Sequence, residues 1–387
     1  MPATFPPPAH GRPPTLPNPP DRAGPPRVER TLVQRNLAWA RANLFAGPWN
    51  TLLTLLVVLL LLWTVPALLD WAVLDATMAP ADIALCMERG GACWAMLQDT
   101  WRMILFGPYP PAEHWRPALA VSLFASLVVA SLVPALWARA GGRRLLLAVW
   151  PPALLVLVAL MHGGVAGLAV VETRLWGGLP LTVILASVGI AFAFLLSLAL
   201  ALGRQSSMPV VRIVCIAYIE LMRGVPLITL LLMASILLPL TLPPDVTIHP
   251  YLRAQLAFIL FFAAYMAEAV RGGLQAIPKG QYAAAKAMGL SYWQSMTRVI
   301  LPQVLRMIIP SMVNIFISAF KDTSLVIVIS MLDLLGTAKA ATSNPDWWGL
   351  FIEPFTFISA IYLVVCSAMS WYSRLLERRY GTAGAHD

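Results

Sequence analysis

Long apolar runs alternate with short polar segments along most of the 387-residue chain. A helix crosses a bilayer with about 20 consecutive apolar residues, and eight runs approach that length. They predict transmembrane helices at residues 49–69, 117–137, 145–161, 179–202, 213–240, 254–270, 308–331 and 355–372. The pattern therefore predicts an all-α protein, a polytopic bundle of about eight membrane-spanning helices.

The distribution of charge predicts how this bundle is oriented. Only 12% of the residues are charged, and Lys and Arg in short loops stay on the cytoplasmic side of a membrane. With both termini in the cytoplasm, nineteen of the 27 basic residues fall in cytoplasmic segments. The net charge of +9 is thereby explained by membrane topology, and no nucleic-acid partner is expected.

The N-terminal part differs from the rest in composition. Residues 1–30 contain eleven prolines and no apolar period, so residues 1–47 are predicted to be a disordered cytoplasmic tail. No cleavable signal peptide is expected, because a long proline-rich tail is the wrong flank for one. Residues 48–176 then form an extension with three spans and one large external loop.

Cysteine and tryptophan residues mark that external loop, residues 70–116. Cys86 and Cys93 lie seven residues apart in a compartment that permits disulfides, so they are either bonded or free. No CxxC or HExxH pattern occurs and the five histidines are scattered, so no metal site is expected. The tryptophans on the external side are interpreted as an interfacial belt, and they are Trp71, Trp94, Trp101, Trp115, Trp347 and Trp348.

A Glu-x-x-Arg-Gly string occurs in two different spans. It places Glu220 beside Arg223 and Glu268 beside Arg271, each pair on one helix face and in the cytoplasmic half of the membrane. A charge at the bilayer centre costs roughly 2.5 to 3.5 kcal/mol, so these side chains should face the bundle interior or water. Two interpretations stay open: each pair is a self-neutralising salt bridge, or it belongs to a translocation path or gate.

Lys321 and Asp322 form a third charged pair, about thirteen residues into the seventh predicted span. Their depth favours a functional role in the path or gate over a purely structural bridge. The Gly224-Val225-Pro226 sequence in the fifth span predicts a break, which either kinks a packed helix or lines a cavity.

Residues 265–324 are too polar for a bilayer at their centre, yet their sequence favours helices. Ile277-Pro278-Lys279-Gly280-Gln281 should stop one helix, and the alanine-rich run 282–288 should start another that ends at Gly289. A helical cytoplasmic segment between two spans suggests a docking surface for a partner.

At this point the residues match a known family. Residues 178–378 resemble the permease subunit of bacterial ABC importers for polar amino acids, the histidine and glutamine permease type, which implies a five-span core at residues 177–380. The matching strings are Leu179-Pro180-Leu181-Thr182, Glu220-Leu221-Met222-Arg223-Gly224-Val225-Pro226-Leu227, Arg271-Gly272-Gly273-Leu274-Gln275, Leu301-Pro302-Gln303 and Phe320-Lys321-Asp322-Thr323-Ser324-Leu325. The extra spans and Met233-Ala234-Ser235 followed by Leu238-Pro239-Leu240 resemble the general L-amino-acid permease subunits, which implies a broad range of L-amino acids.

The resemblance also implies how the chain is coupled to ATP. Family members carry a loop, here residues 276–304, whose short helix docks into a separate ATPase. The corresponding positions are Gly280, Gln281, Ala283, Ala284, Ala285, Gly289, Leu301 and Pro302. Ala283 stands where the family usually has Glu, which implies one weaker polar contact with the ATPase.

No GxxxxGK[ST] string occurs, so ATP and Mg²⁺ are expected on the partner ATPase and no cofactor on this chain. The resemblance implies further partners: a second homologous permease in a heterodimer, a periplasmic solute-binding protein and the amino-acid substrate. It implies a place in the bacterial cytoplasmic membrane.

Two other classes of protein fit the sequence less well than an importer does. A secondary transporter commonly shows paired repeats with broken helices at corresponding positions, whereas the two halves of this chain do not match. An intramembrane enzyme needs a nucleophile and base, or metal ligands, at membrane depth, and no such constellation is visible. The sequence therefore favours a transport subunit without catalytic residues.

Overall fold

The computed structural model describes residues 32–78, 83–138, 140–243 and 245–380. These residues fall into two units, one ending at Leu69 and one beginning at Asp70. Of the predicted proline-rich tail, residues 1–31 lie outside the described residues.

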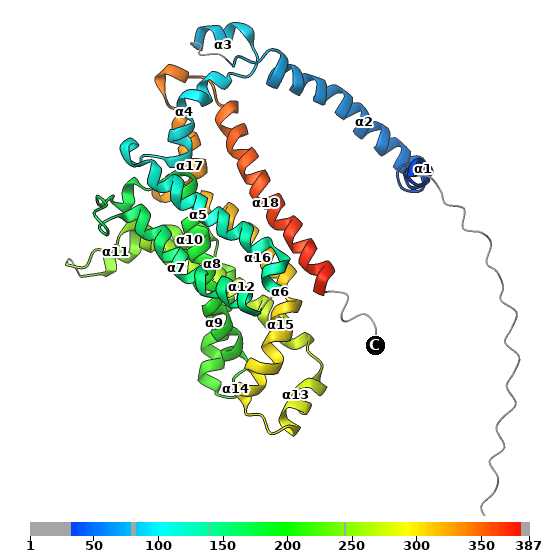
Figure 1. Ribbon diagram of the computed structural model, residues 1–387, viewed down its shortest axis with the longest axis vertical. Coiled ribbons are helices and arrows are strands. Elements are labelled where there is room, and N and C mark those ends of the chain that lie inside the picture. Colours follow the sequence, from blue (N-terminus) through cyan, green and yellow to red (C-terminus); the bar gives the residue numbers. More distant parts are fainter. Residues whose placement is uncertain (1–31, 79–82, 139, 244, 381–387) are drawn as a thin grey trace, which may run out of the picture. The chain divides into compact units, whose positions relative to one another are not determined.

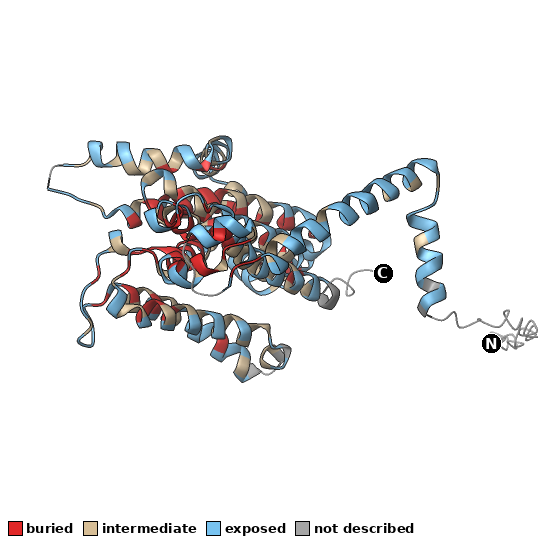
Figure 2. Cartoon of the chain, turned by 90° about the horizontal axis from the view of Figure 1, so that it is seen from above, coloured by how far each residue is buried: buried red, intermediate tan, exposed pale blue. Residues whose placement is uncertain are grey.

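The first unit consists of α1 (Leu32–Asn43) and α2 (Pro48–Leu69). The prediction of disorder up to residue 47 is wrong for α1, a stretch without proline in which alanine and leucine favour a helix. The Thr54 hydroxyl donates to the Leu44 carbonyl across the turn between the helices, at 2.9 Å. No residue of α2 is buried (Figure 2), as expected for a helix that is apolar on every side and made for a lipid environment.

The second unit contains an extension and a core, both helical (Figure 1). The part of the predicted extension that lies in this unit, called the extension from here on, comprises α3 (Ile83–Arg89), α4 (Trp94–Phe106), α5 (Trp115–Leu132), α6 (Pro134–Ala138) and α7 (Ala140–His162). The core comprises α8 (Gly178–Arg204), α9 (Pro209–Gly224), α10 (Leu227–Leu232), α11 (Leu238–Thr241), α12 (Pro250–Ala276), α13 (Lys279–Ala287), α14 (Tyr292–Ser295), α15 (Leu301–Met307), α16 (Ile309–Asp322), α17 (Leu334–Ala341) and α18 (Ile352–Tyr380).

Short turns of other helix types join these elements. Three are π-helical, η1 (Asp70–Leu74), η4 (Met233–Leu237) and η5 (Met296–Ile300). Four are 3₁₀-helical, η2 (Pro111–Glu113), η3 (Thr173–Leu175), η6 (Thr323–Ile329) and η7 (Pro345–Trp347).

Within the described residues, seven helices are long and apolar enough to cross a membrane. The fifth predicted span is instead a bent pair, α9 followed by the helical stretch Leu227–Thr241, with 103° between them. The sequence explains the bend, since Pro226 offers no backbone N–H and Val225 before it takes an extended conformation. The prediction of eight spans therefore holds only if this pair crosses the membrane as one.

Two other predicted spans also end differently. The second predicted span is interrupted at Val133, between α5 and α6. The seventh leaves the α-helical path at Asp322 and continues as the 3₁₀ turn η6.

Helices α8 and α12 form the centre of the core. Small residues line their contact, including Ala186, Gly189 and Ala193 on α8 and Ala254 and Ala257 on α12, and all of them are buried. Small side chains let two helices approach closely, which is how helices associate in lipid. Buried residues gather in this part of the unit (Figure 2).

Arg116, at the start of α5, anchors the extension although the sequence gave no sign of burial. Its side chain is fully inaccessible and donates to the carbonyls of Leu160 and Ala169, both at 2.8 Å. Glu113 lies 3.7 Å away. This guanidinium therefore ties α5 to the end of α7 and to the loop that leads into the core.

Candidate functional site

The polar segment 276–304 folds as a helical loop at one end of the unit, which we call the coupling loop (Figure 1). Helix α12 ends at Ala276, Pro278 caps α13, and Gly289 ends the helical segment with φ of +74°. The Ser291 hydroxyl accepts from the Gln294 backbone N–H and the Gln294 side chain accepts from the Ser291 N–H, a capping box that starts α14. The expected order of helices and breaks is confirmed.

One contact holds the coupling loop to α12, and a second joins the two sides of the loop. The Tyr282 hydroxyl donates to the Leu274 carbonyl at 3.0 Å, and Gln303 and Gln281 approach at 3.5 Å. Burial raises the pKa of the Tyr282 hydroxyl, so it stays a neutral donor. Of the alanines at 283 to 285, only Ala285 is buried against the protein, while Ala283 and Ala284 are exposed.

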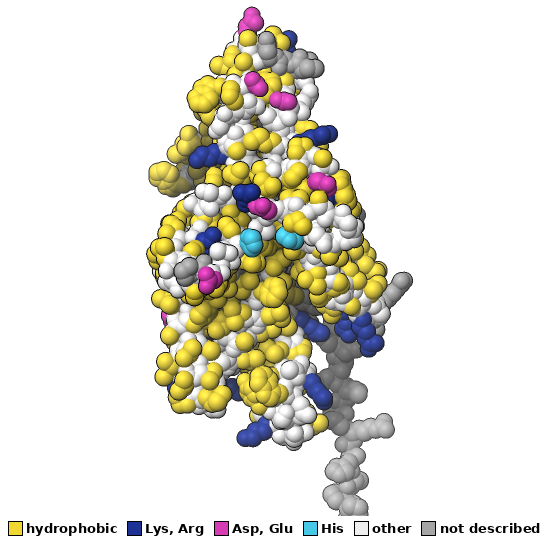
Figure 3. Space-filling view, turned by 90° about the vertical axis from the view of Figure 1, so that its left-hand side faces the viewer, with side chains coloured by type: hydrophobic (Ala, Val, Ile, Leu, Met, Phe, Trp, Pro, Cys, Tyr) yellow, Lys and Arg dark blue, Asp and Glu magenta, His cyan; other side chains and the backbone are white. Residues whose placement is uncertain are grey.

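The outward surface of the coupling loop is apolar and basic. Met288 is 81% exposed, Trp293 64% and Tyr292 50%. No Asp or Glu occurs between Glu268 and Asp322 in the sequence. On the face drawn in Figure 3, acidic side chains gather toward the end with α3 and α4, and basic ones stand without them at the coupling-loop end.

The structure brings four of the charged residues singled out from the sequence into one network. Glu268 of α12 is contacted by Arg271 of the same helix, by Arg204 of α8 at 3.2 Å and by Arg223 of α9 at 4.0 Å. Arg204 reaches Glu220 of α9 as well, at 3.3 Å. Three arginines and two glutamates thus join the ends of three helices.

This network corrects the expected pairing in one place. Glu268 pairs with Arg271, which fits the salt-bridge interpretation, but among the described residues the salt bridge of Glu220 is to Arg204 and not to Arg223. The Arg223 guanidinium lies over the Tyr265 ring at 5.8 Å instead. Sequence reasoning missed Arg204, which was counted only as a cytoplasmic charge at the end of a span.

The network lies directly before the coupling loop along the chain. Arg271 also donates to Gln275 at 2.6 Å, one residue before the end of α12. On the other side, Gly224 ends α9 at the bend. The charged cluster therefore stands between the coupling loop and the broken helix.

Lys321 and Asp322 lie apart from this network, in the last turn of α16 where η6 begins. The Lys321 side chain is exposed and Asp322 is half-buried. Within the part of the chain that the structure describes, neither takes part in a salt bridge. A break in the helix beside a charge leaves backbone groups and side chain free to meet water, a partner or a solute.

Asp333 is a buried carboxylate that sequence reasoning did not single out. Its side chain caps α17 by accepting from the Gly336 N–H at 2.9 Å, and the Tyr362 hydroxyl lies 3.4 Å from its other oxygen. Burial raises its pKa to about 6. The signal available in the sequence was an Asp directly before an apolar helical run, the usual start of a helix.

Cys86 and Cys93 are joined in a disulfide at the opposite end of the unit, so of the two alternatives the structure has the bonded one. The described residues contain no group of three or more His, Cys, Asp or Glu side chains that could hold a metal ion. Trp347 departs from the interfacial belt, because it is 7% exposed and its indole N–H donates to Asp99 at 3.0 Å.

Comparison with known proteins agrees with this architecture. Residues 193–382 match the family described as binding-protein-dependent transport system inner membrane component. The chain is 45% identical over 359 residues to the Escherichia coli (strain K12) inner membrane amino-acid ABC transporter permease protein YhdY, covering 92% of this chain and 96% of YhdY.

Two further similarities cover different shares of the chain. The glutamate/glutamine/aspartate/asparagine transport system permease protein BztC of Rhodobacter capsulatus is 36% identical over 409 residues, covering 89% of this chain and 93% of BztC. A solved structure, titled as the crystal structure of an amino acid ABC transporter with histidines, is 33% identical with a TM-score of 0.47 and covers 52% of this chain and 92% of its own.

Proposed function

We propose, from the premise that this chain belongs to the binding-protein-dependent transport system inner membrane components, that it forms one half of an amino-acid path driven by a separate ATPase. The chain is a permease subunit of an amino-acid ABC transporter, not an enzyme. The proposal concerns which of its residues form the path, which receive the ATPase and which solutes pass.

The observation that carries the proposal is the coupling loop. A rigidly capped helical segment with exposed Met288, Tyr292 and Trp293 stands at the end of the unit and is fixed to α12 and α15. Large exposed apolar side chains on a rigid element are typical of a protein interface. We assign this surface to the ATPase, with Gly280, Gln281, Ala283, Ala284, Gly289 and Pro302 at or beside it and with Ala285 and Leu301 packed beneath. ATP and Mg²⁺ belong to that subunit.

The ionic network is the proposed gate at the same end. Movement of the coupling loop reaches Arg271 through Gln275, and Arg271 shares Glu268 with the arginines of α8 and α9. Separation of these helices would exchange ion pairs for water, which costs little in a partly exposed network. Lys321 and Asp322, beside the break that begins η6, are the proposed contacts on the path itself.

The proposal extends to further partners and to the location. A second permease, homologous and not identical, completes the path, and a periplasmic solute-binding protein delivers the solute. The chain lies in the bacterial inner membrane with both termini in the cytoplasm, as the basic residues of the coupling-loop end support.

A broad range of L-amino acids is the proposed substrate class. The name of BztC covers glutamate, glutamine, aspartate and asparagine, two of them charged and two neutral. A site that anchors the shared carboxylate and ammonium groups needs one basic and one acidic side chain, and Lys321 with Asp322 offers such a set.

The test of the coupling loop uses Gly289→Asp in the assembled transporter. The substitution places a charged side chain at a left-handed backbone position on the docking surface, so uptake should fall to background while the protein still inserts. Uptake of each common amino acid into proteoliposomes containing both permeases, the ATPase and the binding protein gives the readout. Wild-type uptake by a stably inserted Gly289→Asp variant would contradict the assignment of this surface to the ATPase.

Lys321→Met tests the path in the same system. The variant should insert and bind the ATPase normally yet lose uptake, and Asp322→Asn should not rescue it. Poor folding that Asp322→Asn partly rescues would instead reveal a structural salt bridge. Uptake without any ATPase would favour a secondary transporter.

A further inference from the structure

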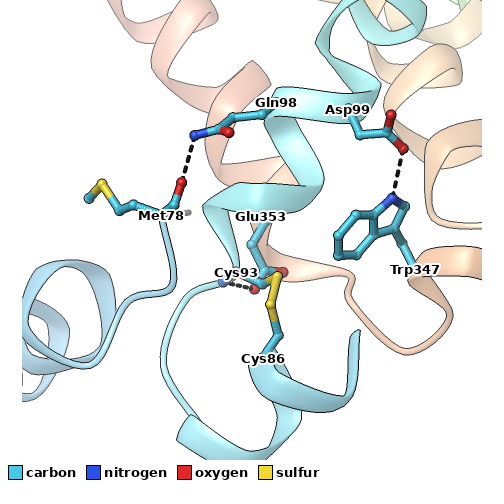
Figure 4. Close-up of a disulfide and its surroundings, with 7 residues drawn as sticks. All are labelled: Met78, Cys86, Cys93, Gln98, Asp99, Trp347 and Glu353. Carbon is cyan, nitrogen blue, oxygen red and sulfur yellow. Dashed lines mark hydrogen bonds between the residues drawn. A yellow bond between two sulfur atoms is a disulfide. The ribbon is translucent and has the colours of Figure 1, made fainter. Parts of the chain in front are cut away.

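Helix α4 of the extension packs against α17 and the start of α18 of the core, around the disulfide (Figure 4). These elements share a buried apolar cluster that includes Met96 and Ile104 of α4 and Leu334, Ala338 and Ala341 of α17. Helix α4 therefore packs against the segment of the core between the last two spans, in addition to its contact with α8.

Polar contacts fix this packing at two points along α4. The Thr337 hydroxyl, fully buried on α17, donates to the Ile104 carbonyl at 2.6 Å, near the end of α4. The Trp347 indole N–H donates to Asp99 at 3.0 Å, in the middle of α4. A hydrogen bond fixes direction as well as distance, which apolar contacts alone do not.

A third contact fixes the first turn of α4. The Cys93 backbone N–H donates to a carboxylate oxygen of Glu353 at 3.0 Å, and Glu353 is only 3% exposed at the start of α18. The disulfide joins this turn to α3, and Figure 4 shows Glu353 and the disulfide side by side. The N-terminus of α4 is thus held from both sides.

The segment that α4 contacts also carries the polar groups at this end of the core. Asp333 caps α17, and the Leu334 N–H donates to Thr182 of α8 at 3.1 Å. The Gly178 N–H at the start of α8 donates to the Leu332 carbonyl at 2.8 Å. Helix α17 follows η6 in the chain, and η6 begins directly after Lys321 and Asp322. The position of α17 therefore limits how far the break between α16 and η6 can move.

We propose that α4 is a positioning element for transport, a brace that holds α17 against α8 while the coupling-loop end moves. In this role the extension keeps the α17 end of the core in place during transport. The expected effect on uptake rests on the proposed function. The expectation that α4 holds α17 in place does not depend on that function.

The experiment removes one brace contact and keeps the shape. Thr337→Val deletes the hydroxyl that reaches Ile104, and Thr337→Ser retains a hydroxyl. Thr100→Val deletes a buried hydroxyl of α4 whose bond among the described residues is within its own helix, to the Met96 carbonyl at 2.8 Å. Each is combined with Ala338→Cys, a fully buried position in the apolar cluster that α17 shares with α4, and with Cys215→Ala and Cys366→Ala.

Two readouts are taken from the assembled transporter in proteoliposomes. The rate at which a membrane-impermeant thiol reagent labels position 338 reports how often α17 leaves α4. Thr337→Val should accelerate labelling roughly two- to tenfold, as expected for loss of one net hydrogen bond, and should lower the maximal uptake rate without changing the half-saturating concentration. Thr337→Ser should restore both values, and Thr100→Val should leave both unchanged.

Other results overturn the proposal. Unchanged labelling in Thr337→Val would show that α4 does not hold α17. Faster labelling with an unchanged maximal uptake rate would show that the contact is structural only. Absence of uptake by the wild-type complex would instead refute the proposed function, since labelling needs no substrate.

Discussion

At the end of the second unit that carries α4 and α17, several polar side chains are buried and hydrogen-bonded within the chain, whereas the coupling loop at the other end exposes large apolar side chains. Thr337, Glu353 and Asp333 are each at most 3% exposed and each makes a hydrogen bond to another element or a cap. On the coupling loop, Met288 and Trp293 are mostly exposed.

The difference indicates which end is stabilised by contacts within the chain and which end exposes surface for a partner. A buried polar group without a partner costs roughly 1 to 3 kcal/mol, so the α4 end gains its position from contacts that only the native arrangement provides. Exposed apolar surface beside basic side chains leaves the coupling loop ready to bury area against a partner. One end is therefore expected to resist motion and the other to transmit it.

Arg116→Met should produce the largest loss of stability. It tests whether the extension depends on hydrogen bonds between its own buried polar groups. The variant leaves the carbonyls of Leu160 and Ala169 without their donor in a fully buried site. We expect a loss of about 3 to 5 kcal/mol in the free energy of unfolding, measured by thermal or denaturant unfolding in lipid nanodiscs. Arg174→Met is the matched control, because Arg174 is 74% exposed in its pair with Glu172 and should change little. Equal stability of the two variants would contradict the comparison.

Two glycines with positive φ offer a direct comparison of the ends. A Cβ at Gly178, φ +61°, would lie 2.1 Å from the Leu105 carbonyl oxygen, whereas one at Gly289, φ +74°, meets nothing within 4 Å. Gly289→Ala should lower the free energy of unfolding by about 1 to 2 kcal/mol, the cost of a side chain at a left-handed backbone position. Gly178→Ala should lower it by more, because the added Cβ also clashes. Unfolding of both variants measures the difference. A larger cost at Gly289 would show that the coupling loop is the more tightly packed end.

The buried carboxylate of Asp333 gives a smaller, pH-dependent effect. Its pKa is raised to about 6, so the folded state binds the proton more tightly than the unfolded state does. This stabilisation is complete below the unfolded pKa near 4 and is lost as pH rises through 6, which amounts to about 1 kcal/mol between pH 5 and 7. Unfolding at the two pH values should show this loss in the wild type and not in Asp333→Asn. An identical pH dependence in both proteins would assign it to another group.

Ala283→Glu should have the smallest effect on the chain itself. The side chain is exposed, so the free energy of unfolding should change by less than about 0.5 kcal/mol. Association with the ATPase should be kept or strengthened, because the substitution supplies the carboxylate that the coupling loop lacks. Copurification of the ATPase with the two proteins gives the measurement. Complete loss of assembly would show that this loop is built differently from those of its relatives.

The spans and the coupling loop were predictable from the sequence because their signals are local. Apolar runs of bilayer length predict the spans, and Pro278 and Gly289 mark the two ends of the helical segment in the coupling loop. The break at Pro226 was visible too, although the 103° bend was not. Its size depends on how α10 packs against α12 and η6, which lie 23 and 96 residues further on, counted from Leu227 to Pro250 and to Thr323.

The contacts that distinguish the two ends could not be read from the chain alone. Arg116 looks like any external basic residue, and Arg204 like any arginine closing a span, until folding brings carbonyls and carboxylates to them. The sequence by itself determined that the chain is a bundle of membrane-crossing helices and roughly where they lie, since length and hydropathy decide what can cross a bilayer. Only the tertiary structure decided that Glu220 meets Arg204 and that α4 meets α17, because such pairs join residues 16 and more than 200 positions apart and depend on backbone approach that no local pattern encodes.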